Sequence, residues 1–333
     1  MSSALQVGIA GATGALGGEL LKVLDAAPWR PGAVQAFARA SSKVSRLRYG
    51  DDDLPVDNLD DLSPDGLDGL FVALPREPAK AVTALALDAG TPVIDASGAT
   101  LADLSVPLVL PWVNAIVLRQ AQARDVIAVP AAPAVLLATL LAPIAQQHPD
   151  LRASATVMVS ASHWGRDASD ELSRQVVALF NHGNPPRKVF PQGLAFDLLP
   201  EVSDTGVSGW TADEVRAAAE VARIAGARCD VSLVGVPMFT GIGAHLRLQA
   251  EGIDVAEVAQ LLDAAGVKVT AAGGRRTPRP RRVDGSHAVH VARLRRGQDG
   301  AVHLWAAADG LLLAARAMVG ALALRLQVDD PSL

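Results

Sequence analysis

Cysteine is almost absent from this sequence, which has a single thiol, Cys229, in 333 residues. One cysteine excludes an intramolecular disulfide framework and any metal site built from several thiolates. It suits a reducing compartment, so we expect a cytoplasmic protein and no metal. The question it leaves open is whether this one thiol is a nucleophile.

The chain has no excess of positive charge, and aromatic side chains are scarce. The formal net charge is −5 at pH 7, and 4% of the residues are aromatic, with Tyr49 as the single tyrosine. Because no global positive field attracts nucleic acid or an anionic membrane, we expect neither as a partner. Tyr49 has no lysine four residues later, so the chain lacks a Tyr-x-x-x-Lys pair for direct hydride transfer.

A membrane-spanning helix is not expected either. Residues 126–145 carry no charge over a membrane-spanning length, but Pro130 and Pro133 lie within them and would break a helix. A short strand, a turn and a buried helix explain this run better. Residues 304–326 contain Asp309 and Arg316, and glycines soon interrupt the N-terminal apolar run, so we also expect no export signal.

The first 130 residues alternate between strand-like and helical patterns. Short apolar runs typical of buried strands occur at 6–11, 33–38, 69–74, 91–97, 107–111 and 126–130. Helical periods lie between several of them. This alternation predicts a Rossmann-type, doubly wound parallel sheet.

The rest of the chain has a different pattern of apolar and polar residues. Long, partly alternating runs at 153–162 and 228–251, and a hairpin pattern at 288–308, predict a largely antiparallel sheet. Helical patterns occupy 170–183 and 211–226, the second opened by Thr211 and Glu214 as a capping box. The fold class is therefore α/β, with a second domain of the α+β type.

A glycine-rich loop follows the first strand and opens the first helix. Small residues let such a turn approach a pyrophosphate, and the helix N-terminus directs free N–H groups at its charge. We predict dinucleotide binding by the loop residues Gly11, Thr13, Gly14, Ala15, Leu16 and Gly17. The alternative is a tight strand-to-helix turn without a ligand.

The end of the second strand-like run indicates which dinucleotide. An NAD site usually has an acidic residue there, to bind the ribose 2′-hydroxyl. This chain has Arg39, Ser41 and Ser42 instead, which suit a 2′-phosphate and predict NADP. A solvated basic loop is the alternative interpretation.

Several longer motifs together resemble the aspartate-β-semialdehyde dehydrogenase family, over nearly the whole chain and in family order. They are VGIAGATGALGGELLKVLD, VIDASGATLADLSVPLVLPWVN, GRDASDELSRQVVALFN, FPQGLAFDLLPEV and VGVPMFTG. The resemblance implies an NADP-binding domain at 1–132, joined by a C-terminal helix at 310–328, and a catalytic-like dimerisation domain at 133–309. It also implies a homodimer and a chemistry in which a cysteine thiolate attacks the aldehyde, hydride passes to NADP, and phosphate releases aspartyl phosphate.

The residues that this chemistry needs are replaced here. The family nucleophile lies in Asn-Pro-Asn-Cys, where this chain has Val129-Pro130-Ala131-Ala132, so Ala132 stands in place of the cysteine. An alanine methyl group cannot form a thioester. The family's active-site glutamine falls on Val159 or its neighbour Ser160, and the catalytic histidine falls on Ile242.

The family's two substrate-binding arginines are replaced as well, by Leu101 and Gly235. Without a nucleophile, a base and two guanidinium groups, nothing in these motifs would bind or activate an acidic acyl substrate. We therefore expect a degenerate paralogue, closest to the Usg-type relatives of the dehydrogenase. Two alternatives stay open: an NADP-dependent oxidoreductase of altered specificity within amino-acid biosynthesis, and a regulatory partner that forms a heteromer with an active paralogue.

Other candidate groups have ordinary explanations. We expect Cys229 to be a core thiol, the serines and His163 of residues 160–167 to form a polar loop, and His245 to lie near a sheet edge. The arginine cluster at 275–296 would serve an acidic partner or, as we favour, form a solvated loop and hairpin edge.

Overall fold

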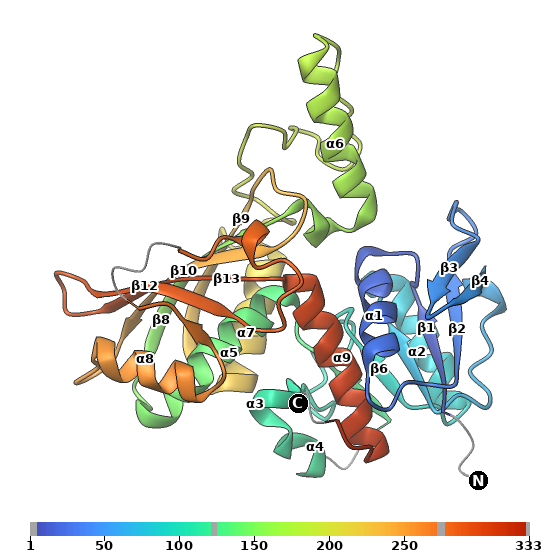
Figure 1. Cartoon of the computed structure of the whole chain (residues 1–333), viewed down its shortest axis with the longest axis horizontal. Coiled ribbons are helices and arrows are strands. Elements are labelled where there is room, and N and C mark those ends of the chain that lie inside the picture. The colour runs from blue at the N-terminus through green and yellow to red at the C-terminus, as the bar shows by residue number, and fades with distance from the viewer. Residues whose placement is uncertain (1–4, 121–124, 272–276, 331–333) are drawn as a thin grey trace. The chain divides into compact units, whose positions relative to one another are not determined.

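The computed structural model describes residues 5–120, 125–271 and 277–330. The chain divides into two compact units (Figure 1). The first consists of Met1–Ala131 and Ala314–Leu333, and the second of Ala132–Leu313.

The first unit contains a seven-stranded sheet in the order β3-β4-β2-β1-β5-β6-β7. Every neighbouring pair is parallel except β3 and β4. The strands are β1 (Gln6–Ala10), β2 (Ala33–Ala38), β3 (Arg46–Tyr49), β4 (Asp52–Asn58), β5 (Gly69–Val72), β6 (Val93–Asp95) and β7 (Val126–Ala128). The predicted Rossmann-type sheet is thus confirmed.

Helices cover both faces of this sheet. Leu20 and Leu24 of α1 share a core with Met318 and Leu322 of α9, while α2 contributes to a separate core on the opposite face. Alternate residues of the strands enter the two cores, as expected for a sheet buried on both sides. The helices are α1 (Ala15–Ala26), α2 (Arg76–Asp88), α3 (Pro111–Asn114), α4 (Ile116–Gln120) and α9 (Gly310–Leu326).

Two strand predictions need correction. Residues 107–111 form no strand, although Leu108 makes an isolated bridge to Ala128. The side chain of Asn114 accepts a hydrogen bond from Leu110 N at 2.7 Å and donates one to Leu108 O at 3.0 Å, which takes up backbone groups that a ladder would need. The pair β3 and β4 was not predicted, because its exposed, charge-rich residues lack a clear apolar alternation.

The second unit contains a six-stranded sheet in the order β11-β12-β13-β10-β8-β9. Three neighbouring pairs are antiparallel, whereas β8–β9 and β11–β12 are parallel. The strands are β8 (Arg152–Val159), β9 (Arg228–Gly235), β10 (Ile242–Gln249), β11 (Lys268–Val269), β12 (His290–Arg296) and β13 (Val302–Ala308). The largely antiparallel sheet and its 288–308 hairpin are confirmed.

The helices of this unit are α5 (Ala132–Gln147), α6 (Arg166–Phe180), α7 (Ala212–Ala225) and α8 (Val255–Ala264). Thr211 and Glu214 form the predicted capping box of α7. In Figure 1, α6 and the loops after it stand away from the body of the sheet. The apolar run 126–145 splits into β7 and the buried helix α5, and none of the helices in the described residues is long and apolar enough to cross a membrane.

Candidate functional site

The glycine-rich loop joins β1 to α1 at the carboxyl edge of the parallel sheet. Gly11 has φ +94°, and a Cβ there would overlap the carbonyl oxygen of Ala73, the residue after β5. At Gly17 a Cβ would lie 2.7 Å from Ala12 Cα, so a side chain would push α1 away from the loop. Both positions therefore require glycine for steric reasons.

The N-terminus of α1 is available to an anion. Gly14 is the N-cap, no side chain caps the helix, and the first turn holds no acidic residue. The first N–H groups of a helix have no intrahelical partners, and the helix dipole favours negative charge beside them. Because β1 lies between β2 and β5, the loop sits where the strand order reverses, which is the usual ligand position in such sheets.

The segment after β2 lies against this loop. The Ser42 hydroxyl donates a hydrogen bond to Thr13 Oγ1 at 3.3 Å, and Ser42 N donates to Arg39 O at 2.8 Å. Arg39 and Ser41 are exposed. The structure therefore brings together the two sequence segments predicted to hold the dinucleotide.

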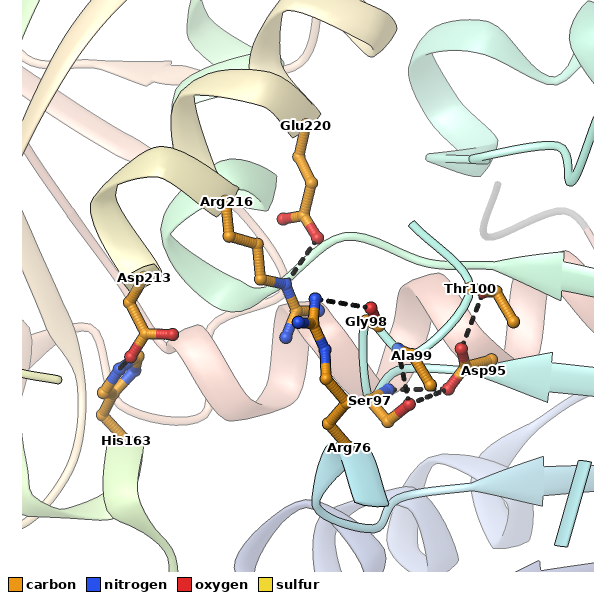
Figure 2. Close-up of polar contacts among 10 residues, drawn as sticks. All are labelled: Arg76, Asp95, Ser97, Gly98, Ala99, Thr100, His163, Asp213, Arg216 and Glu220. Carbon is orange, nitrogen blue, oxygen red and sulfur yellow. Dashed lines mark hydrogen bonds and ion pairs between the residues drawn. The ribbon is translucent and has the colours of Figure 1, made fainter. Parts of the chain in front are cut away.

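A polar network that the sequence analysis missed follows β6 (Figure 2). The carboxylate of Asp95 is fully buried and accepts hydrogen bonds from Ser97 N at 2.8 Å, Ser97 Oγ at 2.6 Å and Thr100 Oγ1 at 2.8 Å. Arg76, the first residue of α2, donates to Gly98 O at 3.0 Å. These bonds fix the shape of a second loop at the carboxyl edge, and Leu101 lies half-buried in it.

In the second unit, the sheet register aligns three of the positions to which the family resemblance assigns functional residues. Val159, the last residue of β8, pairs with Ile242 at the start of β10 on one side and with Gly235 at the end of β9 on the other. All three residues are buried. Residues far apart in the sequence thus meet at one end of the sheet.

Ala132 belongs to the same neighbourhood. It is the first residue of α5, and a Cβ built on Gly310 would lie 3.3 Å from both Ala132 Cβ and Ile242 Cγ2. Ala132 and Ile242, the residues that the family resemblance assigns to the positions of the cysteine and the histidine, therefore flank one glycine. The side chains present there are aliphatic.

Trp164 occupies the space above Gly235. A Cβ on Gly235 would lie 2.7 Å from the Trp164 ring, and the indole is held by a 2.8 Å hydrogen bond from Nε1 to Val202 O. Trp164 also packs edge-on against Phe190, with ring centroids 5.2 Å apart. An arginine side chain at residue 235 would require this indole to move.

Polar groups next to these positions bond mainly to one another. The buried hydroxyls of Ser160 and Ser162 lie 3.0 Å apart, and His163 Nε2 lies 3.4 Å from Asp213 Oδ2 (Figure 2). Burial alone would raise the pKa of Asp213, but the hydrogen bond and charge of His163 outweigh it and lower that pKa. His163 and Asp213 therefore form a local ion pair when the imidazole is protonated.

The remaining candidates lie elsewhere in the second unit. Cys229 is six residues before Gly235 on β9, about 20 Å along the strand. His245 lies on β10, between β13 and β8, so the prediction that it lies near a sheet edge was wrong. It stacks on His303 with centroids 5.3 Å apart, and burial followed by the neighbouring imidazole lowers its pKa. In the arginine cluster, Arg275 and Arg276 lie outside the described residues, while Arg296 pairs with Asp254 at 3.0 Å.

Comparison with known proteins agrees with this architecture. Residues 6–121 match the family model described as semialdehyde dehydrogenase, NAD binding domain, and residues 141–313 match the model described as semialdehyde dehydrogenase, dimerisation domain. The chain therefore belongs to the semialdehyde dehydrogenase family. Within that family it is an aspartate-semialdehyde dehydrogenase-like protein with an NAD(P)-binding domain.

Individual relatives cover almost the whole chain. An aspartate-semialdehyde dehydrogenase of Rickettsia conorii is 29% identical over 318 residues, which are 93% of this chain and 94% of the relative. A USG-1 protein homolog of Pseudomonas aeruginosa is 31% identical with the same coverage. The crystal structure of aspartate semialdehyde dehydrogenase II from Vibrio cholerae superimposes with a TM-score of 0.91 at 25% identity, covering 98% of this chain and 99% of that one.

Proposed function

We propose that this protein is an NADP-binding, homodimeric member of the aspartate-semialdehyde dehydrogenase family that lacks phosphorylating dehydrogenase activity. The observation that carries the proposal is the meeting of Ala132, Val159, Gly235 and Ile242 at one end of the second sheet. These are the positions at which the family resemblance places the cysteine, the glutamine, an arginine and the histidine. Their adjacency supports the motif alignment, since unrelated positions would have no reason to converge.

The chemistry of these side chains supports the loss of activity. An alkyl group at residue 132 cannot attack an aldehyde, and an isoleucine at residue 242 cannot accept a proton. Cys229 does not substitute for the nucleophile, because burial and then the charge of Asp230 raise the pKa of its thiol to about 12. At neutral pH that thiol is protonated and weakly reactive.

The loops of the first unit support retention of the dinucleotide. Gly11 and Gly17 leave space that a Cβ would fill, and the uncapped start of α1 would bind the pyrophosphate. Arg39, with Ser41 and Ser42, would bind the 2′-phosphate. NADP, when bound, would accept a hydride. Ala132 and Ile242, however, cannot form the covalent intermediate from which the family's reaction transfers that hydride.

The homodimer rests on the match of residues 141–313 to the family's dimerisation domain. A cytoplasmic location stays a prediction from the cysteine content.

Besides Gly235, the family resemblance assigns a second substrate-binding arginine to Leu101. We propose that Leu101, half-buried in the loop after β6, replaces that arginine.

Two measurements on one preparation test the proposal. Calorimetric titration with NADPH is expected to give one site per chain, with affinity about tenfold or more lower in Arg39→Glu, because the substitution replaces a phosphate-binding cation by an anion. NADP reduction with aspartate semialdehyde and phosphate is expected to stay at the level of a protein-free control. The same substitution at Arg48, an exposed arginine of β3, serves as the matched control.

Three results would contradict the proposal. Steady phosphate-dependent turnover would restore the dehydrogenase assignment. Absence of NADPH binding would contradict the proposed cofactor. Oxidation of NADPH by other aldehydes or ketones would favour an oxidoreductase of altered specificity.

A further inference from the structure

The second sheet has one buried face and one polar face. Along β10, four alternate residues from Ile242 to Leu248 are buried, whereas His245 and Arg247 between them are half-buried. Because successive side chains of a strand point to opposite faces, His245 and Arg247 lie on the face away from Ile242. We call this polar side the outer face.

Strand pairing gathers two imidazoles and two guanidinium groups on the outer face. His303 of β13 lies opposite Arg247 on one side and opposite Arg295 of β12 on the other. His245 Nε2 lies 3.3 Å from His303 Nδ1. Burial lowers the pKa of His245, and the charges of His303, Arg295 and Arg293 lower it further, which places both guanidinium groups near this imidazole. We call His245, Arg293, Arg295 and His303 the outer-face cluster.

A β-bulge in β12 turns Arg295 to this face. The register shifts between Ala292 and Arg295, so residues 293 and 294 together oppose one residue of β13. Without the shift, strict alternation from Ala292 would point Arg295 to the buried face. Arg293, within the bulge, has φ +57°, which is uncommon for a residue with a Cβ. Such strain persists where function compensates for it.

The two arginines of the cluster have no acidic partner within the described residues. Asp299, in the turn between β12 and β13, is paired with Arg247, which donates to it from Nε at 3.0 Å and from Nη2 at 2.6 Å. Arg295 Nη1 donates instead to the backbone oxygen of Arg293 at 3.0 Å. Both Arg293 and Arg295 are exposed. Their positive charges are therefore available to a ligand.

The neighbours of His245 on the outer face do not neutralise the cluster. Thr156 of β8 and Trp305 of β13 lie directly opposite His245 and carry no charge. Asp230 of β9 lies beyond β8, two strands and about 10 Å from β10. Arg247, two residues along β10, adds a positive charge that its ion pair offsets. The cluster thus combines two fixed positive charges with two imidazoles that gain charge on protonation.

We propose that the outer-face cluster binds a tetrahedral dianion of the phosphate type. Guanidinium groups present forked donors that match the oxygens of such an anion, and a protonated imidazole adds a further charged donor. Free phosphate and the phosphate group of an ester share this chemistry. The cluster lies on the second sheet, whereas the glycine-rich loop and Arg39 belong to the first unit. The proposal therefore does not rest on dinucleotide binding.

Titration with inorganic sulfate, followed by NMR of the histidine rings, tests this site. Sodium chloride holds the ionic strength constant. Saturable shifts of the His245 and His303 signals are expected. Sulfate stays a dianion between about pH 5 and pH 8, so any pH dependence of its binding reports on the protein. A bound dianion stabilises protonated imidazole and raises its pKa, so sulfate affinity is expected to rise by up to about tenfold as the pH falls through this range.

Two arginine variants provide the decisive comparison. Arg295→Gln removes the guanidinium group, and the dissociation constant for sulfate is expected to rise about tenfold or more. Arg293→Asn is expected to weaken binding in the same direction, while its stability in urea stays at the wild-type level or above, because asparagine tolerates the left-handed conformation. Loss of binding in this variant therefore does not reflect unfolding.

Two controls exclude other anion sites. Arg187→Gln changes an exposed arginine elsewhere in the second unit and is expected to bind sulfate as the wild type does. Arg39→Glu is expected to leave the His245 and His303 shifts unchanged, because it alters only the proposed dinucleotide site.

Inorganic phosphate and phenyl phosphate distinguish the two sources of the ligand. Tighter binding of phenyl phosphate supports the site and identifies an ester as the ligand class, whereas tighter binding of inorganic phosphate supports it and identifies the free ion.

Three results would overturn the site. They are shifts that do not saturate, shifts that sodium perchlorate reproduces at the same ionic strength, and wild-type affinity in both Arg295→Gln and Arg293→Asn. NADPH titration reports separately on the proposed function, so either conclusion can fail while the other stands.

Discussion

Cys229 lies on β9 with its thiol buried, at the opposite end of the strand from Gly235. The space next to Ile242, where the family resemblance places a thiol, holds the Ala132 methyl group. The environments differ in a way that matters for reactivity. Burial suppresses the thiolate at residue 229, whereas residue 132 begins a 16-residue helix, and a helix N-terminus lowers the pKa of a thiol.

Alkylation measures this difference between the two positions. With a pKa of about 12, Cys229 is expected to resist iodoacetamide in the native protein at pH 8. Its reaction rate is expected to rise about tenfold per pH unit up to pH 11, because the thiolate fraction does so. Mass spectrometry would follow the product.

The variant Ala132→Cys supplies the comparison, since its half-buried second thiol is expected to react at pH 8 while Cys229 does not. Rapid modification of Cys229 in the folded wild-type protein would show that its environment is not the buried one described.

At the scale of elements, the packing of α6 against the loop of residues 181–199 depends on a buried charge. Glu171 is fully buried on α6, and burial by itself would raise its pKa. The hydrogen bonds from residues 188–190 outweigh that effect and lower the pKa below 4.5. A carboxylate with a lowered pKa stabilises the fold at pH values above its unfolded pKa, and this contribution is lost as the pH falls through the folded pKa.

Glu171→Ala is therefore expected to lower the free energy of unfolding by about 3 kcal/mol at pH 7, because three backbone N–H groups lose a charged acceptor. Urea unfolding followed by circular dichroism measures this loss. The difference from wild type is expected to shrink as the pH falls below 4.5, where the unfolded-state carboxyl begins to protonate.

Asp170→Ala, at the exposed neighbouring position, is expected to change stability by less than about 0.5 kcal/mol. A difference between Glu171→Ala and wild type that grows at low pH would contradict the assigned role of the carboxylate.

At the scale of the whole molecule, the chain has two compact units with separate sheets. The glycine-rich loop and residues 39–42 belong to the first unit, and Ala132, Val159, Gly235 and Ile242 belong to the second. The proposed dinucleotide binding and the proposed loss of acyl chemistry therefore concern different parts of the chain, so one can change without the other.

Differential scanning calorimetry with NADPH tests this separation. A ligand at 100 times its dissociation constant stabilises the state that binds it by about 2.7 kcal/mol. We expect two unfolding transitions, of which NADPH raises the midpoint of one and leaves the other in place. The shift should be lost in Arg39→Glu. Equal shifts of both transitions, or a single cooperative transition, would contradict independent units.

Local patterns predicted much of this fold. The apolar run 33–38 coincides with β2, and Thr211 with Glu214 starts α7 as the capping box predicts. Such features depend on neighbours within a few residues, so periodicity and capping chemistry reveal them. The run 107–111 was mistaken for a strand because a side chain three residues beyond it, Asn114, takes its backbone groups.

By itself, the sequence determined the alternation of strands and helices and the glycine-rich loop, and it predicts the replacement of the family's reactive side chains, because each depends on residue type and short spacing. Tertiary structure decided which distant residues meet. Pairing of β8 with both β9 and β10 sets Val159 between Gly235 and Ile242, and Gly310 brings Ala132 beside Ile242. The rings of Phe180 and Phe196 likewise come into contact because Glu171 and Gln175 bind the backbone of the loop that precedes Phe196. Strand register and buried long-range hydrogen bonds fix these contacts, and the local periodicity of the sequence predicts neither.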